Sequence, residues 1–197
     1  MNTIQSLRAH HGWTGALMIV GSGLGLLASF MLALEAYWRA LQPNRTFSCD
    51  VNAKLSCSDV ASSWQSTLIH LPSGAVPNAF LGLGVFSVFV TLGVLVASGA
   101  SIPRWILWGL RIGVVCTLAF ASWLLYESIF IIGAMCPWCL TMDAGSILLA
   151  VGVWRQWALE RADLHPRAWR FAIHLESLLV AVLILLAFTV IIAVAAQ

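Results

Sequence analysis

The chain has 197 residues, of which 60% are hydrophobic and only 9% are charged, and its formal net charge is +2. An average soluble domain is about 45–50% apolar and about 25% charged, so this composition excludes a soluble single domain. The nearly neutral net charge also gives no electrostatic footprint for nucleic acid.

Charged residues are absent from three long stretches: between Arg8 and Glu35, between Asp59 and Arg104, and after Glu176. Each stretch can hold the roughly 20 apolar residues that a helix needs to cross a bilayer. We therefore expect an all-α membrane protein. Its predicted membrane-spanning helices lie at about residues 13–36, 78–98, 106–129, 137–154 and 173–195.

The positions of the basic residues predict the orientation of these helices. Loops on the cytoplasmic side of a membrane carry an excess of Lys and Arg. One side of the predicted bundle carries Arg8, Arg104, Arg111, Arg155, Arg161, Arg167 and Arg170, and the other carries Arg39, Arg45 and Lys54. The N-terminus is therefore expected in the cytoplasm and the C-terminus outside.

The connection between the first two predicted spans, about residues 39–77, is much longer than most helix connections. Within it, Val60, Trp64 and Leu68 recur every four residues, which is a helical period. This pattern predicts a short interfacial helix that lies over the end of the bundle as a lid. An ordinary membrane-surface helix without a catalytic part is the alternative. Asn78 then suits the cap of the next span.

The five cysteines fall into two groups. Cys49, Cys57, Cys136 and Cys139 lie on the outer side of the predicted membrane, where disulfides persist. Cys116 lies about 13 residues below the outer end of its span, or roughly 20 Å at 1.5 Å per residue. That depth is beyond the reach of a disulfide with the other four, so we assign Cys116 to packing.

The motif CPWC, at residues 136–139, is the sharpest local signal. At a helix N-terminus, unpaired amides and the helix dipole stabilise the first thiolate and lower its pKa below about 8.5, which suits thiol–disulfide exchange. Two alternatives stay open: a zinc site formed by all four outer sulfurs, and two static structural disulfides. The two cysteine pairs together favour electron transfer from thiols in water to an acceptor dissolved in lipid.

Three motifs carry a resemblance to a known family: CDVNAKLSCSDVASSW at 49–64, PNAFLG at 77–82 and CPWC at 136–139. They closely resemble the vitamin K epoxide reductase family, in the bacterial form that serves disulfide bond formation. The resemblance covers about residues 13–154 and extends to the fifth predicted span, which in bacterial members leads to a thioredoxin-like domain. Because the chain ends at Gln197, we expect a single membrane domain without a fused thioredoxin domain, unless that domain was removed.

The resemblance implies roles for the cysteines. Cys136 and Cys139 match the active-site pair, with Cys139 next to a quinone, either ubiquinone or menaquinone. Cys49 and Cys57 match a loop pair that relays electrons to them. Cys49 would form the mixed disulfide with a separate thioredoxin-fold protein, and Cys57 would exchange with Cys136.

Three further residues are candidates for binding the quinone. Asn78 and Ser63 match polar residues of the family's quinone pocket, although Asn78 could be a plain helix cap and Ser63 could simply satisfy the backbone. Asp143 shares a helix face with Cys136 and Cys139, about one turn into the membrane, where an ionisable group is a functional candidate.

We hypothesise that Asp143 exchanges protons with Cys139 or the quinone, and pairing with a neighbouring helix is the alternative. Animal members of the family carry a tyrosine at the corresponding position. By contrast, Glu35 and Glu127, at the outer ends of their spans, need only point into water.

These observations predict a membrane thiol:quinone oxidoreductase of the bacterial cell membrane, which reoxidises a thioredoxin-fold partner and supports disulfide bond formation. A vitamin K quinone or epoxide reductase is the alternative within the same enzyme class. Outside that class, the alternative is a membrane scaffold or transporter with structural disulfides or a zinc site.

Overall fold

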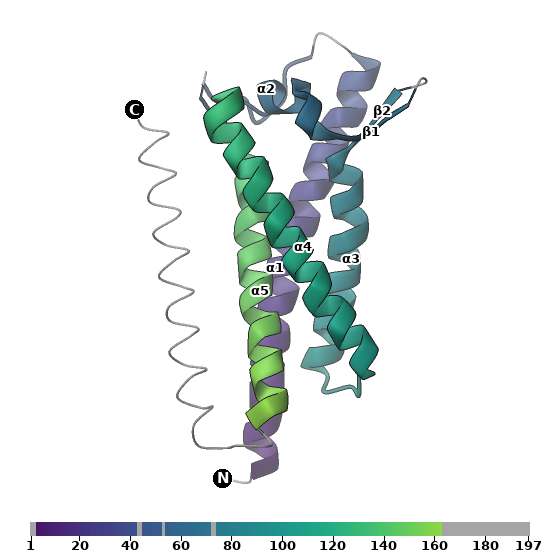
Figure 1. Cartoon of the computed structure of the whole chain (residues 1–197), viewed down its shortest axis with the longest axis vertical. Helices are drawn as coiled ribbons and strands as arrows, with labels where there is room; N and C mark the ends of the chain where they lie inside the picture. The colour runs from purple at the N-terminus through teal and green to yellow at the C-terminus, as the bar shows by residue number, and fades with distance from the viewer. Residues whose placement is uncertain (1–2, 43–44, 53, 72–73, 163–197) are drawn as a thin grey trace.

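A computed structural model, which describes residues 3–42, 45–52, 54–71 and 74–162, shows a bundle of long helices (Figure 1). Its long helices are α1 (Thr3–Leu41), α3 (Asn78–Ala97), α4 (Arg104–Glu127) and α5 (Pro137–Ala162). All four are long and apolar enough to cross a membrane. This confirms an all-α membrane protein and four of its predicted spans. The fifth, at about 173–195, lies outside the described residues.

Two helices extend well beyond the predicted spans. α1 continues to Leu41 and α5 continues to Ala162, whereas hydropathy places their ends near 36 and 154. Hydropathy marks only the part of a helix that needs lipid, and backbone hydrogen bonds can continue the helix past that boundary. α4 passes into the π-helical segment η2 (Ser128–Ile132), which ends at Gly133 in the left-handed conformation, with φ of 73°.

Small residues bring α1 and α5 into close contact. A Cβ atom added to Gly145 would lie 2.6 Å from the carbonyl oxygen of Gly21, and one added to Gly21 would lie 2.5 Å from the backbone nitrogen of Leu149. Glycines at such positions let two membrane helices approach until their backbones touch. The close approach holds the first turns of α5, which carry the CPWC motif, against the C-terminal half of α1.

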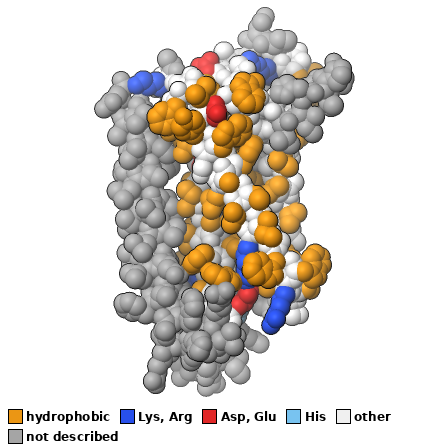
Figure 2. Space-filling view, in the orientation of Figure 1, with side chains coloured by type: hydrophobic (Ala, Val, Ile, Leu, Met, Phe, Trp, Pro, Cys, Tyr) orange, Lys and Arg blue, Asp and Glu red, His pale blue; other side chains and the backbone are white. Residues whose placement is uncertain are grey.

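The outer surface of the bundle is apolar where lipid would surround it. Figure 2 shows hydrophobic side chains over the middle of one face and charged side chains towards its two ends. On α4, Trp105, Ile112 and Val115 are largely exposed. Such exposure would be unfavourable in water but not among lipid chains, so the pattern agrees with a membrane protein.

The loop between α1 and α3 forms a lid over one end of the bundle (Figure 1). It contains the short helix α2 (Cys57–Ser62), the 3-10 turn η1 (Trp64–Ser66) and an antiparallel hairpin of β1 (Thr67–Leu71) and β2 (Gly74–Pro77). The predicted lid helix is thus right in its position, but wrong in its length.

The lid helix ends early because serine side chains bind the backbone locally. Ser63 adopts an extended conformation, and its hydroxyl donates to the carbonyl of Val60. Ser66 donates in the same way to Ala61 and Ser63. Such local hydrogen bonds compete with helix formation. The predicted stripe is therefore broken, and Leu68 lies on β1 instead.

Candidate redox site

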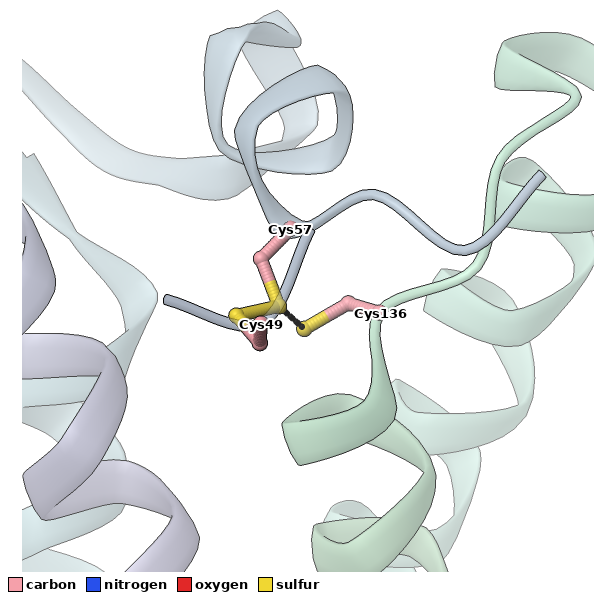
Figure 3. A group of neighbouring side chains, drawn as sticks. All are labelled: Cys49, Cys57 and Cys136. Atoms are coloured by element: carbon pink, nitrogen blue, oxygen red, sulfur yellow. Dashed lines mark hydrogen bonds between the residues drawn. A yellow bond between two sulfur atoms is a disulfide. The ribbon is translucent and has the colours of Figure 1, made fainter. Parts of the chain in front are cut away.

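Three cysteine sulfurs meet beneath the lid. Cys49 and Cys57 form a disulfide, and the Sγ atom of Cys136 lies 3.1 Å from the Sγ atom of Cys57 (Figure 3). Cys57 is 1% exposed and Cys136 is 2% exposed. The Cys57 and Cys136 sulfurs are therefore in contact for thiol–disulfide exchange between the two pairs, in a site closed to water.

Backbone hydrogen bonds next to these cysteines hold the two sulfurs together. The N–H of Ser56 donates to the carbonyl of Met135 at 3.0 Å, and the N–H of Met135 donates to the carbonyl of Lys54 at 2.8 Å. Ser56 precedes Cys57 and Met135 precedes Cys136. This short parallel bridge joins the lid directly to the start of α5, so the sulfur contact follows from the backbone.

Asp50 fastens the two halves of the disulfide loop to each other. Its carboxylate accepts hydrogen bonds from the backbone of Phe47, the backbone and hydroxyl of Ser58, and the hydroxyl of Ser56. Burial raises the pKa of Asp50, but these hydrogen bonds outweigh burial and lower the pKa overall. The sequence alone indicated no role for Asp50, although its place directly after Cys49 was the available signal.

Two glutamates towards the C-terminal ends of α1 and α4, Glu35 and Glu127, do not point freely into water, contrary to our expectation. Glu35 is 5% exposed and accepts hydrogen bonds from the backbone and the hydroxyl of Ser48. Glu127 accepts a hydrogen bond of 2.8 Å from the side chain of Gln65 in the lid. The prediction failed because the lid folds over both helix ends and covers them.

The CPWC motif has the electronic character that its sequence predicts. A hydrogen bond from the side chain of Cys139 lowers the pKa of the Cys136 thiol, burial opposes this change, and the backbone N–H of Cys139, 3.4 Å from the sulfur, lowers the pKa further. The pKa of Cys136 is lowered overall, although the charge of Asp143 acts against the shift. Of the two thiols in the motif, Cys136 is therefore more readily ionised to the reactive thiolate than Cys139.

A cavity of about 710 Å³ lies below the lid, between the helices. Its lining is mainly apolar, and its size falls in the range of about 300–1,000 Å³ that is typical of small-molecule sites. Cys49 is not among the residues that line it. The cavity brings together the other predicted site residues: Cys57, Ser63, Asn78, Cys136, Cys139 and Asp143.

Cys116 lines the same cavity and is exposed, so its assignment to packing is wrong. The depth of Cys116 along its span does not determine which face of the helix carries it. The side of α4 that carries Cys116 borders the cavity.

Asn78 and Ser63 differ in how their polar atoms are used. Asn78 is not a plain cap, because Pro77 holds the cap position and no side chain bonds there. Instead, Nδ2 of Asn78 donates to the carbonyl of Gln65 at 2.6 Å. Ser63 does satisfy the backbone, through its hydroxyl bond to Val60.

Asp143 lines the cavity from α5 and is partly buried. Within the described ranges, no hydrogen bond or ion pair joins Asp143 to another residue. Its carboxylate is therefore one of the few polar groups that a ligand in the cavity could meet.

The sulfur cluster also bears on the zinc alternative. The sulfurs of Cys49, Cys57 and Cys136 lie within 4.8 Å of one another, close enough to bind one ion. Zinc needs thiolate ligands, however, and the disulfide between Cys49 and Cys57 leaves neither sulfur as a thiolate. In this oxidation state the cluster is suited to exchange.

Comparison with known proteins agrees with this geometry. A family model described as the Vitamin K epoxide reductase family matches residues 16–154, a range that contains all five cysteines. No curated protein matches the chain.

Proposed function

Because the chain belongs to the vitamin K epoxide reductase family, it is a membrane oxidoreductase with cysteine pairs, and we propose that it is a thiol:quinone oxidoreductase that supports disulfide bond formation. The observation that carries this proposal is the 3.1 Å contact between the Cys57 and Cys136 sulfurs, at the edge of an apolar cavity. Membership in this enzyme family argues against the scaffold and transporter alternatives.

Thiol–disulfide exchange accounts for the relay between the two pairs. When the loop pair is reduced, the Cys57 thiolate attacks Cys136 in an oxidised CPWC motif, forming a Cys57–Cys136 disulfide and releasing the Cys139 thiolate. Cys49 then attacks Cys57, so the loop disulfide forms and Cys136 leaves as a thiolate. The structure has the oxidation state reached after these two steps, with the loop pair oxidised and Cys136 and Cys139 reduced.

The cavity fits a quinone head group. Its lining is mainly apolar, as a flat ring with two carbonyls requires, and it borders both cysteines of the motif. When bound there, a quinone would supply an acceptor for two electrons and two protons. Cys136 and Cys139 would give up the electrons as their disulfide forms.

The remaining parts of the proposal concern the partner and the membrane. A separate thioredoxin-fold protein would deliver electrons to Cys49. The basic residues support a bacterial cell membrane location with the cysteines on the outer side, where disulfides persist.

The proposal is tested by the oxidation state of the cysteines in the full chain, reconstituted in lipid. Dithiothreitol as the donor should convert Cys49, Cys57, Cys136 and Cys139 to alkylatable thiols. A short-tailed ubiquinone or menaquinone analogue, added after the donor is removed, should return all four to disulfides with a matching amount of quinol formed. If neither analogue reoxidises the cysteines, quinone reductase activity is ruled out.

Replacing Asp143 by Asn should lower the rate of quinone reduction by about 100-fold, the lower range for a positioned acid or base. Asn keeps the size of the side chain but cannot exchange a proton. The measurement is the rate of quinol formation from about pH 5 to 9, with dithiothreitol as the donor. An unchanged rate across that range would remove the proton role of Asp143.

A further inference from the structure

We propose that Glu127 is a second proton-transfer group at the cavity and that Gln65 of the lid holds it in position. Glu127 is the last residue of α4 and lines the cavity together with Gln65. This inference rests on the proposed function, because it concerns the protons that quinone reduction consumes.

Most hydroxyl groups that line the cavity donate their hydrogen atom to a hydrogen bond within the protein. Five lining hydroxyls donate to backbone carbonyls of their own segments: Ser63, Ser66, Thr67, Thr117 and Ser146. A hydroxyl bonded in this way has no proton left to give to a ligand. Among the lining carboxyls, Asp143 and Glu127 are left as the groups able to deliver protons.

Gln65 fixes the position of Glu127. Gln65 is 5% exposed, and its Nε2 donates to Oε2 of Glu127 at 2.8 Å. Its backbone carbonyl accepts the hydrogen bond from Nδ2 of Asn78. One residue of the lid is therefore hydrogen-bonded both to Glu127 of α4 and to Asn78 of α3, the asparagine that the family resemblance places at the quinone.

The reaction moves two protons, which two such groups can relay. Oxidation of Cys136 and Cys139 forms one S–S bond and releases two electrons and two thiol protons. Reduction of a quinone to a hydroquinone takes up the same numbers. A quinone has two oxygens, so two separate carboxyls, Asp143 on α5 and Glu127 on α4, can each protonate one of them and regain a proton afterwards.

Other titratable groups also face this cavity. Arg39, Cys116, Cys136, Cys139 and Asp143 are among its lining residues. The Arg39 guanidinium is bonded to the carbonyl of Ser58 and the hydroxyl of Ser62, which hold its charge against α2. A pH profile of the wild type combines all of these groups, so the contribution of Glu127 must be measured as a difference between variants.

The test compares Glu127→Gln with the wild type in lipid, with dithiothreitol as donor and a short-tailed ubiquinone as acceptor. Glutamine can still accept the Gln65 hydrogen bond but cannot ionise. Quinol formation should fall by about 100-fold, the lower range for a positioned acid or base, and Glu127→Asp should restore part of the rate. Reduction of the Cys49–Cys57 disulfide by dithiothreitol without quinone should stay at the wild-type rate.

A second readout does not depend on turnover. The infrared difference spectrum between quinone-bound and quinol-bound protein should contain a carboxyl band that disappears in Glu127→Gln. Glu160→Gln is the matched control, because Glu160 lies at the far end of α5 in an ion pair with Arg111 and does not line the cavity. This control should keep the wild-type rate and spectrum.

The outcomes separate the two proposals. If the wild type forms no quinol from ubiquinone or menaquinone analogues, the proposed function fails. If the wild type is active and Glu127→Gln matches it in rate, pH profile and infrared spectrum, only the role of Glu127 fails. A loss of the same size in Glu160→Gln would also overturn that role, since the effect would then be general.

Discussion

Replacing Cys136 by Ser should lower the rate of quinone reduction by about three orders of magnitude or more, the scale of loss of an essential nucleophile. The free sulfur of Cys136 lies 3.1 Å from the Cys57 sulfur. The serine hydroxyl that replaces it cannot form the Cys57–Cys136 disulfide, so electrons cannot pass between the two pairs. The loop disulfide itself should still form and be reduced. The measurement combines quinol formation with alkylation of Cys49 and Cys57.

Replacing Cys139 by Ser gives the matched comparison, because it blocks the same overall reaction at a different step. Cys57 and Cys136 can still form their disulfide when Cys139 is absent, and Cys49 is then left as a free thiol. The expected product is a protein with Cys49 alkylated and a Cys57–Cys136 disulfide found by mass spectrometry. Wild-type quinol formation in Cys136→Ser would contradict the relay order.

The cysteines were predictable from sequence because their chemistry and spacing carry the information. A C-x-x-C motif at a helix start indicates thiolate chemistry wherever the helix lies, and the charge asymmetry placed both pairs at the same end of the bundle. The long helices were also predictable, because a bilayer imposes a minimum apolar length. Neither inference depends on which segments touch in the folded chain.

The supporting polar residues were not predictable for the opposite reason. In the sequence, Glu35 and Glu127 have the positions of exposed residues near helix ends, but in the folded chain the lid covers both. Asn78 has the position of a helix cap, but its side chain donates to the backbone carbonyl of Gln65 instead. The hairpin that follows η1 was missed because the lid sequence also has a helical period. The lid helix ends early because of serine hydrogen bonds that form only in the folded loop, and the helical period does not reveal them.

Replacing Gly145 by Val should destabilise the bundle by about 3 kcal/mol or more, at the upper end for inserting bulk into a packed interior. Its Cβ would lie 2.6 Å from the carbonyl oxygen of Gly21 and 3.0 Å from the backbone nitrogen of Gly25. Both are backbone atoms of α1, which cannot move aside as a flexible side chain can. The measurement is denaturant unfolding in detergent, followed by tryptophan fluorescence.

Gly23→Val provides the control on α1, because a Cβ there would meet no heavy atom of the described residues within 4 Å. Its stability should stay within about 0.5 kcal/mol of the wild type, as for substitutions that disturb no packing contact. Equal destabilisation of both variants would mean that helix packing at Gly145 is not the cause. Gly145 lies two residues after Asp143, so a displaced α5 should also slow quinone reduction, whereas Gly23→Val should not. The glycine contact thus links the packing of α1 and α5 to the placement of the Cys139 and Asp143 side chains in the cavity.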